Sequence, residues 1–270
     1  MSLAAFSIAA SYLKAGIDMF PRDHWEQHYD LSIELYSLYL EAEYCICHTE
    51  EVGRVAGEVI TAAKSFQDKQ RAYLCLIKAL SVENKLEEAI EISFNALSQL
   101  DVHCPSPLPE KDAFMTNWKE TKTKLEKMSD TEFLNLKEMS DSSKISAMKF
   151  FHLLFLYTFY SKQCYLPTLI IQSTQMTLNY GICKESSIAF SACSYVLLEF
   201  QDFKGSEHVG RLSLGILEKF KAQEYISQVY VLIYVGIFSW VRNFKLNLEP
   251  IMIGYQMGMQ TGDIQHAIFN

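Results

Sequence analysis

Two helix-length segments joined by a short polar turn lie between Gln70 and Leu100, and they constrain the fold more than any other feature. The first runs from Arg71 to Glu83 and the second from Leu86 onward, each with apolar residues at helical spacing. A pair of amphipathic helices this short cannot bury its apolar faces alone and has to stack on neighbours. The chain is therefore expected to fold as an array of packed helices.

Residues that break helices are rare in the whole chain. Its 270 residues include only 11 Gly and 6 Pro, and so low a content of turn formers favours long helices over a many-turned β fold. Hydrophobic residues make up 49% and charged residues 21%, which is typical of a folded chain rather than a disordered one. Apolar patterns of helical period recur throughout and predict an all-α fold of about ten to thirteen antiparallel helices.

The expected helices can be placed from this period and from capping residues. Their ranges are 3–20, 24–47, 51–66, 71–83, 86–100, 112–127, 129–137, 144–160, 166–180, 184–200, 206–220, 224–241 and 247–261. Several starts carry side chains suited to an N-cap, namely Asp23 with Glu26, Asn84 with Glu87, Ser129 with Glu132, and Ser140 or Asp141. Gly181 and Gly262 stand where a left-handed residue is expected to end a helix.

The clearest break in the helical pattern falls at 101–111. Pro105, Pro107 and Pro109 alternate there, and three prolines so spaced cannot be helical and favour an extended path. This predicts N-terminal helical repeats at 1–104, a Pro-containing connection with short helices at 105–140, and C-terminal helical repeats at 141–270. One continuous array is the alternative. Both ends lie within an apolar pattern, so the sequence is expected to be a fragment of a larger protein.

Charge and cysteine content narrow the function classes. The net charge is −8 and no basic stripe is present, so a nucleic-acid partner is not expected. The cysteines number seven and stand mostly in apolar helical contexts, which predicts reduced thiols in a cytoplasmic protein.

The segment 225–241 has no charged residue. It is short for a membrane span and contains polar residues, so a buried helix is preferred over a span or a strand.

A set of apolar, glycine and aromatic positions along most of the chain forms a recognisable pattern. The positions are 12–21, Trp25, His28, Tyr29, Leu31, Leu35, 41–44, 84–90, Met139, Asp141, Ala147, Met148, 179–181, Ala189, Phe190, 254–256, Gly258 and 261–263. This pattern resembles the tetratricopeptide-like helical region of multi-domain signal-transduction kinases, serine/threonine or histidine kinases with a STAND/AAA-type ATPase domain. The resemblance spans roughly residues 5–265 and implies a tetratricopeptide-like α-solenoid.

The resemblance implies a non-catalytic regulatory or protein-interaction segment, which couples partner or ligand binding to kinase output. It implies no catalytic residue, cofactor or metal in this segment, although the parent protein would be a kinase with an ATPase domain. The expected partners are a protein, a peptide or neighbouring domains of the same chain, with no membrane span. Two alternatives are a stand-alone tetratricopeptide-like adaptor and a small-molecule sensor, whose pocket would be lined by Phe150, Phe151, Phe155, Tyr157 and Tyr160.

Motifs that would carry chemistry are weak. His24 and His28 stand one helical turn apart, a spacing that can hold zinc, but Glu26 does not occupy the position used by zinc proteases. A third ligand would have to come from Cys45, Cys47 or His48, which nothing in the sequence brings close. The Cys45-x-Cys47 spacing also differs from the two-residue spacing of redox motifs. Carboxylate pairs such as Glu41/Glu43 and Glu87/Glu88 are interpreted as solvated faces.

Aromatic residues offer the only candidate partner surface in the sequence. Their default interpretation is core packing, and the alternative is a peptide-binding surface on the concave side of the array, since such surfaces use aromatic anchors. The candidate residues are Trp25, Tyr29, Tyr36, Tyr39, Tyr44, Trp240 and Tyr255.

Overall fold

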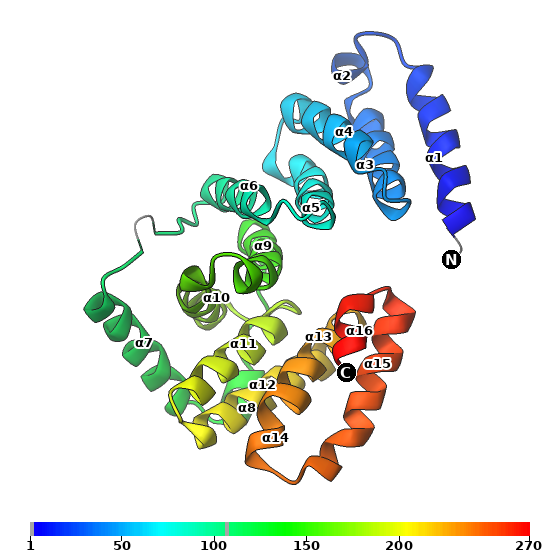
Figure 1. The fold of residues 1–270 in the computed structure, drawn as a ribbon. Helices are drawn as coiled ribbons and strands as arrows, with labels where there is room; N and C mark the ends of the chain where they lie inside the picture. The colour runs from blue at the N-terminus through cyan, green and yellow to red at the C-terminus, as the bar shows by residue number, and fades with distance from the viewer. Residues whose placement is uncertain (1–2, 106–107) are drawn as a thin grey trace. The chain divides into compact units, whose positions relative to one another are not determined.

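The computed structural model describes residues 3–105 and 108–270, and all regular secondary structure in these ranges is helical (Figure 1). The expected all-α class is therefore confirmed. By internal contacts the chain divides into two compact units. Unit 1 comprises Met1–Cys104 and Leu156–Gln163, and unit 2 comprises Pro105–Phe155 and Cys164–Asn270. The segment 105–140 thus belongs to unit 2.

Unit 1 is built from successive helices that pack on their neighbours in sequence and on the next helix but one. Contacts join α1 to α3 and α3 to α5 as well as consecutive pairs. Its apolar core includes Leu40, Val52, Val55 and Val59. The elements are α1 (Leu3–Asp18), α2 (His24–Gln27), α3 (Tyr29–Cys45), α4 (Thr49–Ala62), α5 (Phe66–Val82) and α6 (Leu86–Gln99).

Unit 2 has α11 at its centre, packed against α10, α12 and α13, while α13 packs on α15. Phe133 and Phe190 meet in its core with ring centroids 4.6 Å apart. Helix α9 contributes residues to both units. The elements after α6 are α7 (Lys111–Glu126), α8 (Asp130–Leu134), α9 (Ser142–Tyr160), η1 (Gln163–Tyr165), α10 (Leu166–Tyr180), α11 (Ser186–Glu199), α12 (Phe203–Phe220), α13 (Gln223–Tyr230), η2 (Val231–Ile237), α14 (Phe238–Val241), η3 (Phe244–Asn247), α15 (Leu248–Thr261) and α16 (Ile264–Phe269).

Helices α3, α5, α6, α11 and α12 end in one recurring turn. A residue just after each helix has a φ between 48° and 60°, and none of these residues is glycine. The next amide in turn donates to the carbonyl five residues earlier, as in Lys85 to Leu80 and Ala222 to Leu217. This hydrogen bond defines the Schellman motif, which satisfies carbonyls at the helix end while the chain reverses. The five left-handed residues are Cys47, Asn84, Asp101, Gln201 and Lys221.

Helices α2 and α6 begin at His24 and Leu86 as expected, but the two N-caps expected before them are wrong. The helix expected at 24–47 is interrupted at His28, whose φ of −131° and ψ of 41° are not helical. The Asp23 side chain bonds to Gln27 and makes no capping hydrogen bond. Asn84 does not cap α6, because it occupies the left-handed position that ends α5. Asparagine tolerates that conformation better than most residues, since its short side chain bonds locally.

Other expected boundaries are confirmed. Ser129 and Glu132 form a reciprocal capping box at α8, and Asp141 accepts hydrogen bonds from the Ser143 and Lys144 amides before α9. Gly262 ends α15 in the left-handed conformation. Gly181 instead has φ 110° and ψ 175°, which is not the left-handed helical conformation.

The segment 223–241 is one continuous helical run with an unusual centre. Its residues Val231–Ile237 form a π-helix between α13 and α14, so the alternative of a strand is wrong. By length and composition alone this run could cross a membrane, and 33% of its apolar stretch is buried. A core helix of a soluble protein passes the same test.

Candidate functional site

The candidate aromatic residues are split between the units and differ in exposure. Tyr36 and Tyr39 are buried in the core of unit 1, where Trp25 and Tyr44 pack partly buried against the same core. Tyr29 is also partly buried and donates a hydrogen bond to Asp68 at 2.8 Å. Two of the seven are exposed, Trp240 at 73% and Tyr255 at 42%, and both belong to unit 2.

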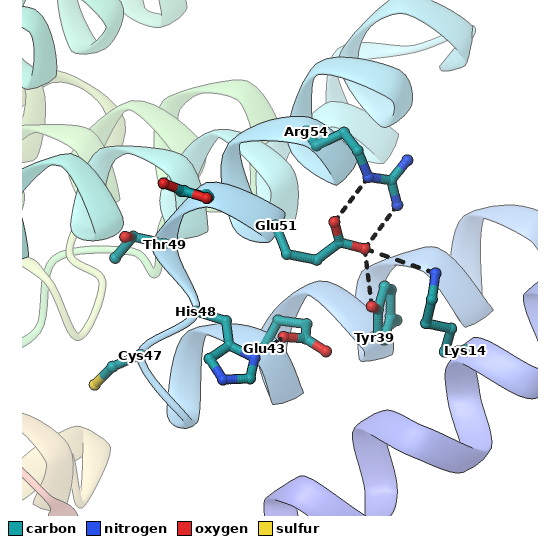
Figure 2. Close-up of a pocket in the computed structure, with 9 residues that line it drawn as sticks. Lys14, Tyr39, Glu43, Cys47, His48, Thr49, Glu51 and Arg54 are labelled. Carbon is teal, nitrogen blue, oxygen red and sulfur yellow. Dashed lines mark hydrogen bonds and ion pairs between the residues drawn. The ribbon is translucent and has the colours of Figure 1, made fainter.

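A polar pocket opens on unit 1 at the start of α4, with a volume of about 750 Å³ (Figure 2). Side chains from α1, α3 and α4 line it together with the α3–α4 turn. We call it the Glu51 pocket. Its lining residues are Lys14, Tyr39, Glu43, Cys47, His48, Thr49, Glu50, Glu51 and Arg54.

The Glu51 carboxylate is the centre of the pocket and is contacted by donors from three helices. Arg54 Nη2 and Nε lie 2.7 Å and 2.8 Å from its two oxygens. The Tyr39 hydroxyl donates a hydrogen bond to Oε1 of Glu51 at 2.9 Å. Lys14 Nζ lies 3.9 Å away. The hydrogen bond from Arg54 lowers the pKa of Glu51 to about 2, and the bond from Tyr39 acts in the same direction. Glu51 is therefore a fixed anion, suited to polar contacts rather than to proton transfer.

A second polar contact, between Glu43 and His48, lies at the same opening. Glu43 is 6% exposed, and its Oε2 lies 2.8 Å from Nδ1 of His48, an exposed residue. Figure 2 shows the Cys47 thiol pointing away from this pair, because Cys47 occupies the left-handed turn position after α3. Groups of both charge signs thus line the pocket, which suits a polar ligand or a polar segment of a protein.

A stripe of exposed apolar side chains runs along α15 in unit 2. Its members are Leu248, Met252, Tyr255 and Met259, each between 42% and 55% exposed. Their spacing of four, three and four residues places them on one side of the helix. We call them the α15 stripe.

Another side of α15 is buried in unit 2, so the helix carries two apolar surfaces. Ile251, Gly254 and Gly258 are buried, and a Cβ at Gly258 would lie 2.7 Å from that of Ala267 in α16. Figure 1 shows α15 beside α13 and α16 at the edge of unit 2. Exposed apolar side chains aligned on one side of a helix are a candidate interaction surface.

The histidine and cysteine residues considered above for metal binding or redox chemistry make ordinary packing and hydrogen-bond contacts. The ring of His24 stacks between Phe20 and Tyr36, and its Nδ1 lies 2.9 Å from the Ser32 hydroxyl. Within 3–105 and 108–270, no three His, Cys, Asp or Glu side chains are placed to hold a metal ion. Burial raises the pKa of the Cys45 thiol.

The residues of the alternative small-molecule pocket pack mostly in the interior. Phe150, Phe151, Phe155 and Tyr157 are buried, and Tyr160 is exposed. The four buried rings contribute to the hydrophobic packing of the units to which they belong.

Sequence reasoning named only Tyr255 of the α15 stripe, although the spacing of all four residues can be read from the sequence. The signal was a helix with two apolar sides, and the elements packed on α15 leave the stripe exposed. The Glu51–Arg54 pair also has a helical spacing of three residues. The contact of Tyr39 with Glu51 joins two helices and has no such local signal.

Comparison with known proteins does not assign the chain to a family. No protein-family model matches the chain, and no curated protein matches it. The Glu51 pocket and the α15 stripe are the features of the described residues that bear on function.

Proposed function

We propose that the chain is a tetratricopeptide-like α-solenoid segment that binds protein partners and does no chemistry of its own. Alternate helices pack in both units, α1 on α3 and α5 on α3 in one, α11 on α13 and α15 on α13 in the other. The same Schellman turn recurs after five helices. Stacked helical hairpins with a repeated turn support a solenoid, and solenoids act through extended binding surfaces.

The observation that carries the binding role is the α15 stripe. Four large apolar side chains stand half exposed along one side of a helix, and burying them against another apolar surface is favourable by roughly 25 cal/mol per Å². The complementary surface for such a stripe is the apolar face of another helix. The partner chemistry is therefore that of an amphipathic helix.

The proposed biological setting is a signalling kinase with an ATPase domain, and it rests on the resemblance. Residues that carry the resemblance have packing roles here, such as Asn84 in a helix-ending turn and Phe190 in the core. Partner binding would favour one arrangement of the helices over another and so change the activity of the attached domains. The segment would act in the cytoplasm.

Two measurements test this proposal. Sequencing the transcript beyond both ends should reveal a continuing frame with kinase and ATPase domains, whereas stop codons close to both ends would favour the stand-alone adaptor. The purified chain should neither hydrolyse ATP nor phosphorylate itself above the level of a buffer control. Activity that copurifies with the folded chain would overturn the non-catalytic role.

The Glu51 pocket favours a second candidate function, a sensor of small polar molecules. Its volume of about 750 Å³ and its charged groups of both signs could accommodate a polar metabolite. A ligand that binds only the folded chain raises the melting temperature. A thermal-shift screen of amino acids, organic acids and polyamines should therefore show a shift for wild type that Glu51→Gln and Lys14→Ala abolish.

A further inference from the structure

We propose that the α15 stripe binds the α15 stripe of a second copy of this chain, with the two helices antiparallel about a twofold axis. This inference rests on the proposed function, because it names the partner of the same surface. Three features of α15 support it: the symmetry of the stripe, the placement of charge along the helix, and the area that the stripe offers.

The spacing of the stripe is the same when read from either end. A twofold axis that passes midway between Ile253 and Gly254 sets Leu248 opposite Met259 of the second copy. It also sets Met252 opposite Tyr255 of the second copy. A self-complementary surface of this kind is what an isologous dimer needs, since each contact is made twice. Methionine sulfur against an aromatic ring is also a favourable contact.

Charge along α15 favours the antiparallel arrangement. Glu249 is the single charged residue of this helix. In antiparallel pairing the two Glu249 residues lie about 13 Å apart along the helix axis, at a rise of 1.5 Å per residue, which exceeds the physiological screening length of about 8 Å. Parallel pairing would set them side by side. The antiparallel arrangement also brings the Lys245 end of one copy to the Asp263 end of the other.

The available area predicts a weak dimer. Four side chains that are about half exposed offer on the order of 400 Å² per copy, hence about 800 Å² in total, which is below the roughly 1,000 Å² of a stable specific interface and fits a weak, transient one. Association should therefore depend on concentration in the range of about 10–100 μM.

Sedimentation equilibrium of the purified chain between about 1 and 200 μM tests the proposal. Wild type should show a reversible monomer–dimer equilibrium. Met252→Glu should weaken dimerisation at least tenfold, because a carboxylate would be buried twice against apolar groups. Tyr12→Glu is the matched control, since Tyr12 is an exposed aromatic residue at 76% on α1, and it should leave the equilibrium unchanged. Circular dichroism should show both variants folded.

A charge-pair experiment tests the predicted register. Met252→Glu and Tyr255→Lys chains should each dimerise poorly, whereas an equimolar mixture should associate again, because the twofold axis sets position 252 of one copy against 255 of the other. A wild-type chain that stays monomeric to 200 μM would overturn the inference. So would a dimer that Met252→Glu leaves intact, or a mixture that does not associate. These outcomes leave the reading-frame and ATP tests of the proposed function unaffected.

Discussion

Asn247 donates a hydrogen bond from Nδ2 to the carbonyl oxygen of Tyr234 at 3.0 Å. Tyr234 lies within the π-helix Val231–Ile237, and its carbonyl also accepts from the Ser239 hydroxyl at 2.9 Å. Buried carbonyl oxygens need hydrogen-bond donors, and two side chains supply them to this carbonyl in the middle of the π-helix. Asn247 is itself fully buried. This side chain therefore joins the segment before α15 to the irregular helix that precedes it.

Asn247→Ala should lower the free energy of unfolding by about 1–2 kcal/mol, because it leaves a buried carbonyl with one donor fewer. Urea denaturation measures this change. Asn179→Ala is the control, since Asn179 is exposed at the end of α10, and it should change stability by less than about 0.5 kcal/mol. Equal effects of the two substitutions would contradict the role assigned to Asn247.

Removing the charge of Glu51 should destabilise the chain in a pH-dependent way. Glu51→Gln should cost about 1–2 kcal/mol at pH 7, because the charge-assisted bonds from Arg54 and Tyr39 are lost. The pKa of Glu51 falls from its ordinary 4.5 to about 2 in the folded chain. The stabilisation by the wild-type carboxylate is thus complete above pH 4.5 and is lost as the pH falls toward 2.

Urea denaturation of wild type and Glu51→Gln at pH 7, 5, 4 and 3 checks this dependence. The difference between the two should be constant at pH 7 and 5 and should shrink at pH 4 and 3. Glu50→Gln serves as the control, because Glu50 lines the same pocket but is exposed. A difference that stays constant down to pH 3 would show that the ion pair does not set the stability profile.

Two helical glycines should respond to alanine in opposite directions. A Cβ at Gly258 would lie 2.5 Å from the Ser227 hydroxyl oxygen and 2.9 Å from the Asp263 carbonyl oxygen, so Gly258→Ala should cost about 1–3 kcal/mol. A Cβ at Gly57 in α4 would meet no atom within 4 Å. Gly57→Ala should therefore stabilise by up to about 1 kcal/mol, through the gain in helix propensity. Thermal unfolding compares the two variants directly.

Lys221→Gly should stabilise the chain, which is the reverse of what glycine does inside a helix. Lys221 has a φ of 48° after α12, a conformation that costs residues with a Cβ on the order of 1 kcal/mol. The net gain should be about 0.5–1 kcal/mol. Glu218→Gly, one turn earlier and exposed, should instead lose about 1 kcal/mol. A loss of stability for both variants would mean that contacts of the Lys221 side chain contribute more to stability than the relief of backbone strain does.

Local sequence determined most of the helices and several of their ends. Apolar spacing located the helices, and the Ser129–Glu132 capping box and Gly262 acted as their residue types predict, because capping depends on side chains within a few residues. The stripe on α15 was also present in the sequence as a regular spacing. The sequence did not show that the stripe would be exposed, since spacing alone does not tell which of two apolar sides a neighbouring helix will cover.

The tertiary structure decided the features that depend on distant contacts. The left-handed role of Asn84, the break at His28 and the π-helix completed by Asn247 differ from the local prediction or lie outside it. The burial of Tyr39 and its bond to Glu51 join α3 to α4. Such outcomes are set by packing and by hydrogen bonds between helices, and helix period carries no information about which side chain another helix will meet.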